Sequence, residues 1–157
     1  MALTFELKET IAAPPARVFA AVVDVDRMGE WMPGFVRIER LTPGPLAKGS
    51  QFAETRKMFG HEAREVFEVT EFDPPRAMVL FVDGTKGSSR SGWYRFRHTV
   101  EPSGAGAVLT LSGEIGGASG CMALFGKLMC GPMKKAIAKD LAALKAWIER
   151  DAAGAAD

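Results

Sequence analysis

Three charged side chains within two otherwise apolar, alternating stretches are the strongest candidates for chemistry in this chain. Glu54 and Arg56 lie between Phe52 and Met58, and Glu65 lies in the following stretch. A buried charge without a partner costs several kcal/mol, so such groups are expected to be paired. The planar guanidinium of Arg56 could anchor the carboxylate, carbonyl or hydroxyl group of a ligand. Equally, the charges could form an ion pair that only keeps two strands in register.

The register of the two strands decides which of these side chains share a face. We expect residues 60–61 to form a two-residue turn, so that Phe59 pairs with Glu62. In this register Arg56 lies directly opposite Glu65. The more apolar of the two faces is expected to point inward. That face comprises Phe52, Glu54, Arg56, Met58, Ala63, Glu65, Phe67 and Val69.

His98 and Tyr94 are the other polar side chains expected on the inner face. A histidine can transfer protons near neutral pH, and a tyrosine can donate a hydrogen bond to a ligand oxygen. In an enzyme, His98 or Glu65 would be the base. Arg56 or Tyr94 would then polarise a carbonyl. Alternatively, His98 is a core histidine whose hydrogen bonds are satisfied, and Tyr94 only packs.

Continuing the same register across the turn at 73–76 pairs Val69 with Leu80. This extends the expected inner face over three more strands. Its further members are Met78, Leu80, Val82, Tyr94, Phe96, His98, Val100, Leu109, Leu111 and Ile115.

The composition excludes several classes of protein. The 157 residues suffice for one domain with a full core, and a net charge of +1 offers no general attraction to nucleic acid. No apolar run could span a bilayer, and the first residues lack a signal-peptide core. The two cysteines suit reduced thiols in a cytoplasmic protein, and the two histidines are not spaced as zinc ligands. No hydrolase, metalloprotease or nucleotide-binding motif is present, so we expect no metal and no cofactor.

Hydrophobic periodicity predicts the elements that must position these side chains. Period-two alternation and turn residues predict seven strands, at 3–11, 35–41, 50–59, 62–72, 77–83, 92–101 and 107–115. Helical spacing and proline or glycine punctuation predict two short helices at 15–23 and 24–31, and a long one at about 119–150.

The long helix carries the remaining candidates. Ile137, Leu141, Leu144 and Ile148 form an apolar stripe, and Asp140 is expected to lie off it. A second apolar series occupies the first half of the helix, which the glycines and Pro132 should weaken or bend. Its members, which either pack in the core or line a pocket opposite Trp31, are Met122, Phe125, Met129 and Met133.

The order of elements predicts an α+β fold. One apolar helix stripe and one sheet face both need cover, and curling the sheet around the long helix provides it. We expect a single domain over 1–157, ordered over about 3–150, with a frayed tail at 152–157.

Several local motifs resemble those of the START-like superfamily, also called the SRPBCC or Bet v 1-like helix-grip fold, and most closely its polyketide cyclase/dehydrase and lipid-transport branch. The resemblance covers about residues 3–150 and lies in the stretches 11–19, 24–33, 69–76 and 141–145, together with Gly49. At 104–107 relatives often have Gly-Gly-Thr, and this chain departs from them. The resemblance implies a curved seven-stranded antiparallel sheet wrapped around a long C-terminal helix, with two short helices between strands 1 and 2. It also implies an apolar cavity for a hydrophobic ligand.

Three functions remain open, because one fold hosts many activities. The first is binding or transport of a lipid, isoprenoid, quinone or aromatic polyketide-like molecule, by a monomer or homodimer. The second is a cofactor-free cyclase or dehydratase, and the third is a co-chaperone-like interaction module. The residues expected to line the ligand site are Trp31, Phe52, Glu54, Arg56, Met58, Glu65, Phe67, Met78, Leu80, Tyr94, Phe96, His98, Leu111, Met122, Phe125, Met129 and Met133.

Overall fold

The computed structural model describes the backbone of residues 2–117 and 121–154, and the side chains of 2–117 and 130–154. The elements in chain order are β1 (Leu3–Ile11), α1 (Pro15–Val23), the 3-10 helix η1 (Val25–Glu30), β2 (Phe35–Arg40), β3 (Gln51–Met58), β4 (His61–Asp73), β5 (Ala77–Asp83), the 3-10 helix η2 (Gly84–Lys86), β6 (Trp93–Ser103), β7 (Gly106–Gly116) and α2 (Cys121–Gly154).

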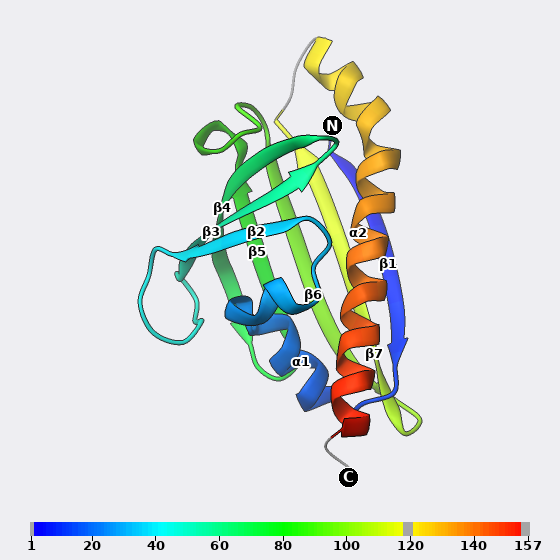
Figure 1. Ribbon diagram of the computed structural model, residues 1–157. Coiled ribbons are helices and arrows are strands. Elements are labelled where there is room, and N and C mark those ends of the chain that lie inside the picture. The colour runs from blue at the N-terminus through cyan, green and yellow to red at the C-terminus, as the bar shows by residue number, and fades with distance from the viewer. Residues whose placement is uncertain (1, 118–120, 155–157) are drawn as a thin grey trace.

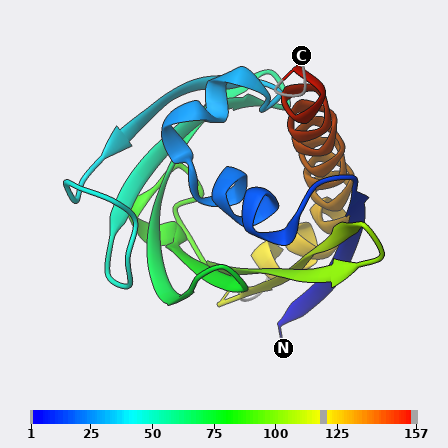
Figure 2. The ribbon, with the colours of Figure 1, turned by 90° about the horizontal axis from the view of Figure 1, so that it is seen from below.

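The seven strands form one antiparallel sheet in the order β1-β7-β6-β5-β4-β3-β2. The sheet curves, and α2 runs beside its edge strand β1 (Figure 1). Viewed along α2, the sheet and α2 together surround α1 (Figure 2). This arrangement confirms the predicted helix-grip fold, with α1 and η1 as the two short helices between β1 and β2.

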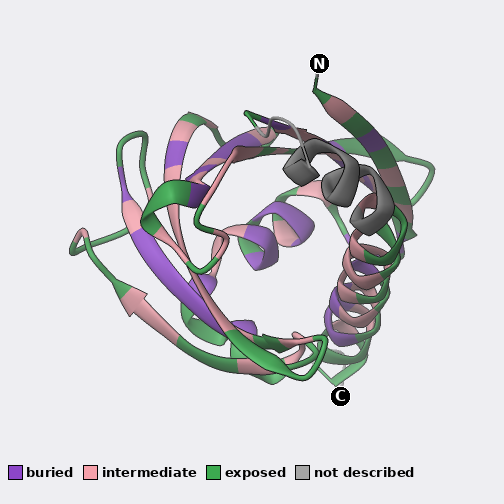
Figure 3. Cartoon of the chain, turned by 90° about the horizontal axis from the view of Figure 1, so that it is seen from above, coloured by how far each residue is buried: buried purple, intermediate pink, exposed green. Residues whose placement is uncertain are grey.

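The packed core lies at the end of the molecule where α1 meets the second half of α2. Pro15 occupies the first turn of α1, where its missing N–H costs nothing. Val18, Leu109 and Ile148 are almost completely buried around this helix, and Figure 3 shows the buried α1 at the centre of the surrounding strands. Because α1 packs on β6 and β7 while α2 packs along β1, neither helix fully covers the inner face of β4 and β5.

α2 is longer than the sequence predicted. It continues past Arg150 to Gly154, so residues 152–154 are helical where we expected a frayed tail, and 155–157 lie outside the described residues. Pro132 lies inside the helix and cannot donate a backbone hydrogen bond, and the first turns lean away from the axis of the rest (Figure 1). No helix within 2–117 and 121–154 is both long and apolar enough to cross a membrane.

The β3–β4 hairpin corrects the predicted register. Met58 pairs with His61, so the two-residue turn is 59–60 and not 60–61. Both turn residues have positive φ, +52° at Phe59 and +84° at Gly60, as a primed hairpin turn requires. The pairing therefore shifts by two residues, and Arg56 lies opposite Ala63 instead of Glu65. A two-residue shift leaves every side chain on its predicted face, because side chains alternate with a period of two. Further along the sheet, the predicted pairing of Val69 with Leu80 is confirmed.

Phe59 provides a test of this turn. A left-handed backbone costs an ordinary side chain about 1 kcal/mol, whereas asparagine tolerates it. The Phe59 side chain is 58% exposed, so its removal sacrifices little packing. We expect Phe59→Asn to raise the free energy of unfolding by about 0.5–1 kcal/mol in urea denaturation. Phe59→Ala removes the same ring without relieving the backbone, so an Asn variant no more stable than the Ala variant would contradict this account.

Candidate functional site

An internal cavity of about 250 Å³ lies between the inner face of the sheet, α1 with η1, and α2. Its wall is mainly apolar, and its volume lies just below the usual range of ligand pockets, about 300–1,000 Å³. Phe67 and Phe96 point inward yet are only half-buried. We attribute their remaining accessible surface to the cavity, which both side chains line.

Most side chains predicted from the sequence stand at this wall. They are Trp31, Glu54, Arg56, Met58, Glu65, Phe67, Met78, Leu80, Tyr94, Phe96, His98, Leu111 and Met133. Phe52 is not at the wall: it is 1% exposed and stacks on Phe67, with ring centroids 5.2 Å apart, inside the packed core. The predictions for Met122, Phe125 and Met129 fall on side chains outside the described residues.

The strongest polar contact at the cavity is an ion pair between β3 and α2. The Nη1 and Nη2 atoms of Arg56 donate to the two carboxylate oxygens of Asp140 over 2.8 and 2.9 Å. Nη2 also donates to the Pro33 carbonyl oxygen at 3.0 Å. Both charged side chains are less than 15% exposed. The partner of Arg56 is therefore a residue of the long helix, where the sequence predicted Glu65.

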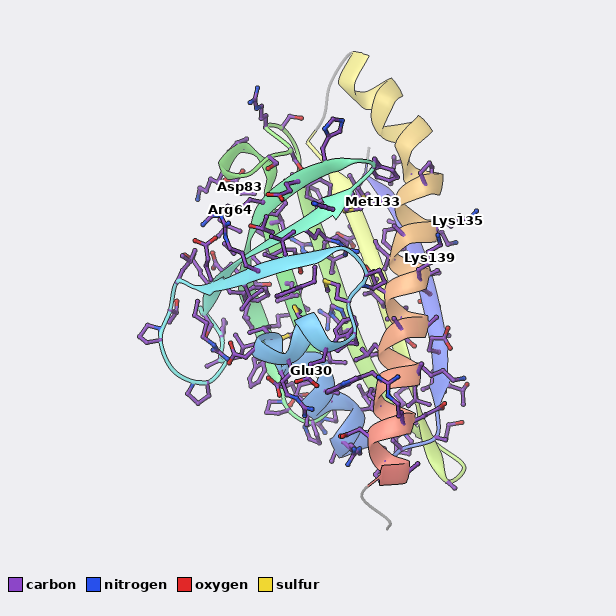
Figure 4. The ribbon with its side chains drawn as sticks, viewed as in Figure 1. Glu30, Arg64, Asp83, Met133, Lys135 and Lys139 are labelled. Carbon is purple, nitrogen blue, oxygen red and sulfur yellow. The ribbon has the colours of Figure 1, made fainter. Side chains whose placement is uncertain are left out.

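Asp140 corrects the prediction that it lies off the apolar stripe. It follows Ile137 by three residues and precedes Leu144 by four, which places all three on one side of the helix. Lys135 and Lys139 lie on the outer side of α2 and point away from the sheet (Figure 4). The spacing that places Asp140 inward is present in the sequence, but its partner on β3 is not visible there.

Glu54 is a buried carboxyl group without a close counter-charge. Its side chain is 9% exposed, and its nearest cationic atom, Arg56 Nη1, lies 3.9 Å away. It stands directly opposite Glu65 in the β3–β4 ladder. Burial raises the pKa of Glu54 from 4.5 to about 7; Arg56 opposes this shift and Asp140 adds to it. Near neutral pH this group can therefore both give and take a proton.

Glu65 is held by the loop that follows η2. One of its oxygens, Oε1, accepts from the backbone N–H and the hydroxyl group of Ser89, at 2.8 and 2.7 Å. The Tyr94 hydroxyl in turn donates to Ser89 Oγ at 3.0 Å. The loop approaches so closely that a Cβ atom on Gly87 would overlap Glu65 Oε2. Ser89 was not predicted, because nothing in its irregular segment links it to Glu65 before the chain folds.

His98 lies on β6 between Met78 of β5 and Leu111 of β7. All three side chains line the cavity. Burial lowers the pKa of His98 from 6.5 to about 4, so the imidazole is neutral at physiological pH. Its Nδ1 atom is buried and has no hydrogen-bond partner among the described residues.

Unpartnered polar atoms cluster at this cavity. Buried polar side-chain atoms normally have partners, so each exception calls for an explanation. Within the part of the chain that the structure describes, the exceptions are Trp31 Nε1, Thr55 Oγ1, Arg56 Nε, Glu65 Oε2 and His98 Nδ1. All of these residues except Thr55 line the cavity. Four residues of the wall thus each keep one buried polar atom without a partner in the described protein.

A second hollow, of about 540 Å³, lies where the end of α2 approaches α1 and η1. Its charged groups bind one another. Arg17 contacts Asp151 at 2.6 Å, and Arg27 donates two hydrogen bonds to Glu30, which Figure 4 labels at this end of the molecule. Among the described residues, this hollow therefore has fewer polar atoms without a hydrogen-bond partner than the cavity has. In neither hollow do the described His, Cys, Asp and Glu residues form a group that could hold a metal ion.

The chain matches a known family. The family model described as polyketide cyclase / dehydrase and lipid transport matches residues 2–149, so the chain belongs to this family. Among its relatives is an uncharacterized protein of Mycobacterium tuberculosis, 28% identical over 123 residues, which make up 78% of this chain and 80% of the relative.

Solved structures share the fold at low sequence identity. The Zhui aromatase/cyclase from Streptomyces sp. R1128 superimposes with a TM-score of 0.78 at 17% identity, over 96% of this chain and 95% of that one. Ara h 8.0201 superimposes with a TM-score of 0.69 at 18% identity, over 94% and 98% of the two chains. The predicted superfamily is thereby confirmed, and the identities are low enough that these structures establish the fold alone.

Glu54 and His98 predict opposite pH dependences of stability. The folded state raises the Glu54 pKa, so this group's stabilising contribution is present below pH 4.5 and is lost as the pH rises through about 7. The folded state lowers the His98 pKa, so its contribution is present above pH 6.5 and is lost as the pH falls through about 4. Between pH 4.5 and 6.5 the two trends should largely cancel.

Single variants should separate the two trends. Relative to the unmodified protein, Glu54→Gln should gain stability as the pH rises from 4.5 to 7, and His98→Asn should lose stability as the pH rises from 4 to 6.5. Each slope should approach about 1.4 kcal/mol per pH unit, the value for one proton. Urea denaturation over this range measures both. A variant that parallels the unmodified protein throughout would refute the assignment for that residue.

Proposed function

We propose that the protein binds a hydrophobic small molecule, such as a lipid, isoprenoid, quinone or aromatic polyketide-like compound, inside the cavity and carries it. The observation that carries this proposal is a mainly apolar cavity inside the curve of the sheet, with a few polar side chains at its wall. Ligand pockets combine an apolar wall with a few oriented polar groups in this way.

The energetic cost of the space supports the proposal. A sealed apolar void loses about 24 cal/mol for each Å³, so 250 Å³ would forgo on the order of 6 kcal/mol, which is an upper bound for a space that opens to solvent. That amount is comparable to the net stability of a whole domain, about 5–15 kcal/mol. Such a loss is understandable when an occupant restores the missing contacts. A pure protein-interaction module, the third function considered from the sequence, has no need of a hollow interior.

Ala63→Phe should test the proposal directly. Ala63 lines the cavity beside Arg56, and a phenyl ring at this position would occupy space now open to a ligand. We expect the protein to bind the uncharged fluorescent probe N-phenyl-1-naphthylamine with a stoichiometry of one. The variant should bind it at least ten-fold more weakly, because the two rings would compete for one volume.

The matched control is Glu62→Phe, which adds the same ring to the adjacent, exposed position on the opposite face of β4. It should leave probe affinity unchanged. Native mass spectrometry of detergent-free protein supplies a second readout, in which a co-purified hydrophobic molecule should be present and should be absent from Ala63→Phe. Equal probe binding by all three proteins would contradict an internal site.

A cyclase or dehydratase is the second candidate function. One specific observation favours it: the neutral imidazole of His98, the guanidinium of Arg56 and the Tyr94 hydroxyl group belong to side chains that converge on one cavity. A base and hydrogen-bond donors around an apolar space could fold and dehydrate a flexible polycarbonyl chain. The family description and the name of the Zhui aromatase/cyclase are consistent with such a role.

His98→Gln distinguishes the two candidates. A dehydratase without its base should retain a precursor one water heavier than the molecule that co-purifies with the unmodified protein. A carrier should retain the same molecule in both. Native mass spectrometry of the two proteins from the same host makes the comparison, with probe affinity confirming that the variant's cavity is intact. An identical bound molecule in both proteins would argue against catalysis by His98.

A further inference from the structure

The charges at the cavity wall are unbalanced. Among the described residues that line it, the guanidinium of Arg56 is the one permanent cation, whereas Glu54, Glu65 and Asp140 contribute three carboxyl groups. His98 is neutral. Even with Glu54 protonated, the remaining carboxylates outnumber the cation. A bound anion would therefore meet net repulsion in a region where water screens charges weakly.

The guanidinium of Arg56 has no free pair of parallel N–H groups with which to bind a carboxylate. Its two terminal nitrogens donate to both oxygens of Asp140, and Nη2 also donates to the Pro33 carbonyl. Glu54 Oε1 lies 3.9 Å from Nη1. Bidentate recognition of a carboxylate requires two parallel N–H groups. The one nitrogen of the guanidinium without a hydrogen bond, Nε, is buried and carries a single N–H group.

The unpartnered atoms of Arg56 and Glu65 do not receive a ligand charge either. Arg56 Nε and Glu65 Oε2 are both buried, and Glu65 Oε2 lies against Gly87, which does not line the cavity. The two residues are diagonal neighbours on the same face of the β3–β4 ladder, because Arg56 pairs with Ala63 and Glu65 pairs with Glu54. An uncharged polar end, such as a hydroxyl group, brings no charge against the carboxyl groups of the wall, whereas a carboxylate does.

We propose that the cavity accepts hydrophobic molecules whose polar end is uncharged and rejects those that end in a carboxylate. This proposal rests on the function proposed above, since it specifies the ligand of the same cavity. It reverses the expectation from the sequence that Arg56 could anchor a carboxylate. A fatty acid or other apolar carboxylic acid would have to bring its charge next to Glu65 and Asp140 without a free cation to receive it.

Three probes of nearly equal shape test this selectivity: naphthalene, 2-naphthol and 2-naphthoate. Each is titrated against the bound N-phenyl-1-naphthylamine at pH 8, where naphthoate is ionised and naphthol is not. Naphthalene measures the apolar contribution alone, and 2-naphthol adds an uncharged polar end to the same ring system. We expect 2-naphthoate to bind at least ten-fold more weakly than 2-naphthol.

Variants test whether residues of the cavity wall cause this selectivity. Glu54→Gln removes one carboxyl group while keeping its shape, so it should narrow the ratio of naphthol to naphthoate affinity at least three-fold. Glu62→Gln removes an exposed carboxylate from the neighbouring strand and should leave the ratio unchanged. Asp140→Asn is a second test, since it frees the two terminal nitrogens of Arg56, and it should raise naphthoate affinity.

The outcomes separate this proposal from the one on which it rests. Binding of naphthalene with equal or tighter binding of naphthoate than of naphthol would overturn the selectivity and leave ligand binding in place. If Glu54→Gln and Glu62→Gln changed the ratio of naphthol to naphthoate affinity equally, the selectivity would also be overturned. The discrimination would then come from the electrostatic field of the whole protein and not from the cavity wall. Failure of every probe, N-phenyl-1-naphthylamine included, would refute the cavity as a ligand site.

Discussion

The ion pair between Arg56 and Asp140 is the interaction on which the arrangement of the cavity depends. α2 packs along β1 at one edge of the sheet, and the ion pair joins it to β3, next to the other edge. The curved sheet and the helix are thus connected on both sides of the hollow. Removing one member would leave an uncompensated charge in a mainly apolar wall, which in buried pairs costs about 3–5 kcal/mol. The geometry of the site and the stability of the fold are therefore coupled through one contact.

The same ion pair sets the chemistry of the wall. Burial raises the pKa of Glu54 to about 7; Arg56, 3.9 Å away and bound to Asp140, offsets only part of this shift. Glu65 is oriented separately, by Ser89 from the loop after η2. Each group is held by a different element, yet all of these side chains line the shared space. This distribution explains why the wall combines a neutral imidazole, an occupied cation and excess carboxyl groups.

Family membership restricts the possible functions of the protein less than the side chains of the cavity wall do. The family joins polyketide cyclases and dehydrases with lipid transport, and these activities share a fold while differing in what the cavity holds and does. In this chain, a few side chains at the cavity wall distinguish between these activities. Apolar bulk around Arg56 and His98 supports the proposed binding, and the excess of carboxyl groups supports the proposed exclusion of carboxylates.

The sequence by itself determined the elements and the inward faces of the strands, because alternation is a local property that survives a two-residue error in register. It therefore placed Tyr94, His98 and Glu65 at the cavity while pairing Arg56 with the wrong residue. Only the tertiary structure decided the partner of Arg56, which lies 84 residues away on another element. It also decided the contact of Ser89 with Glu65, since an irregular loop has no periodicity to read. Contacts between distant elements depend on how the sheet curves around the helix, and no local pattern records that curvature.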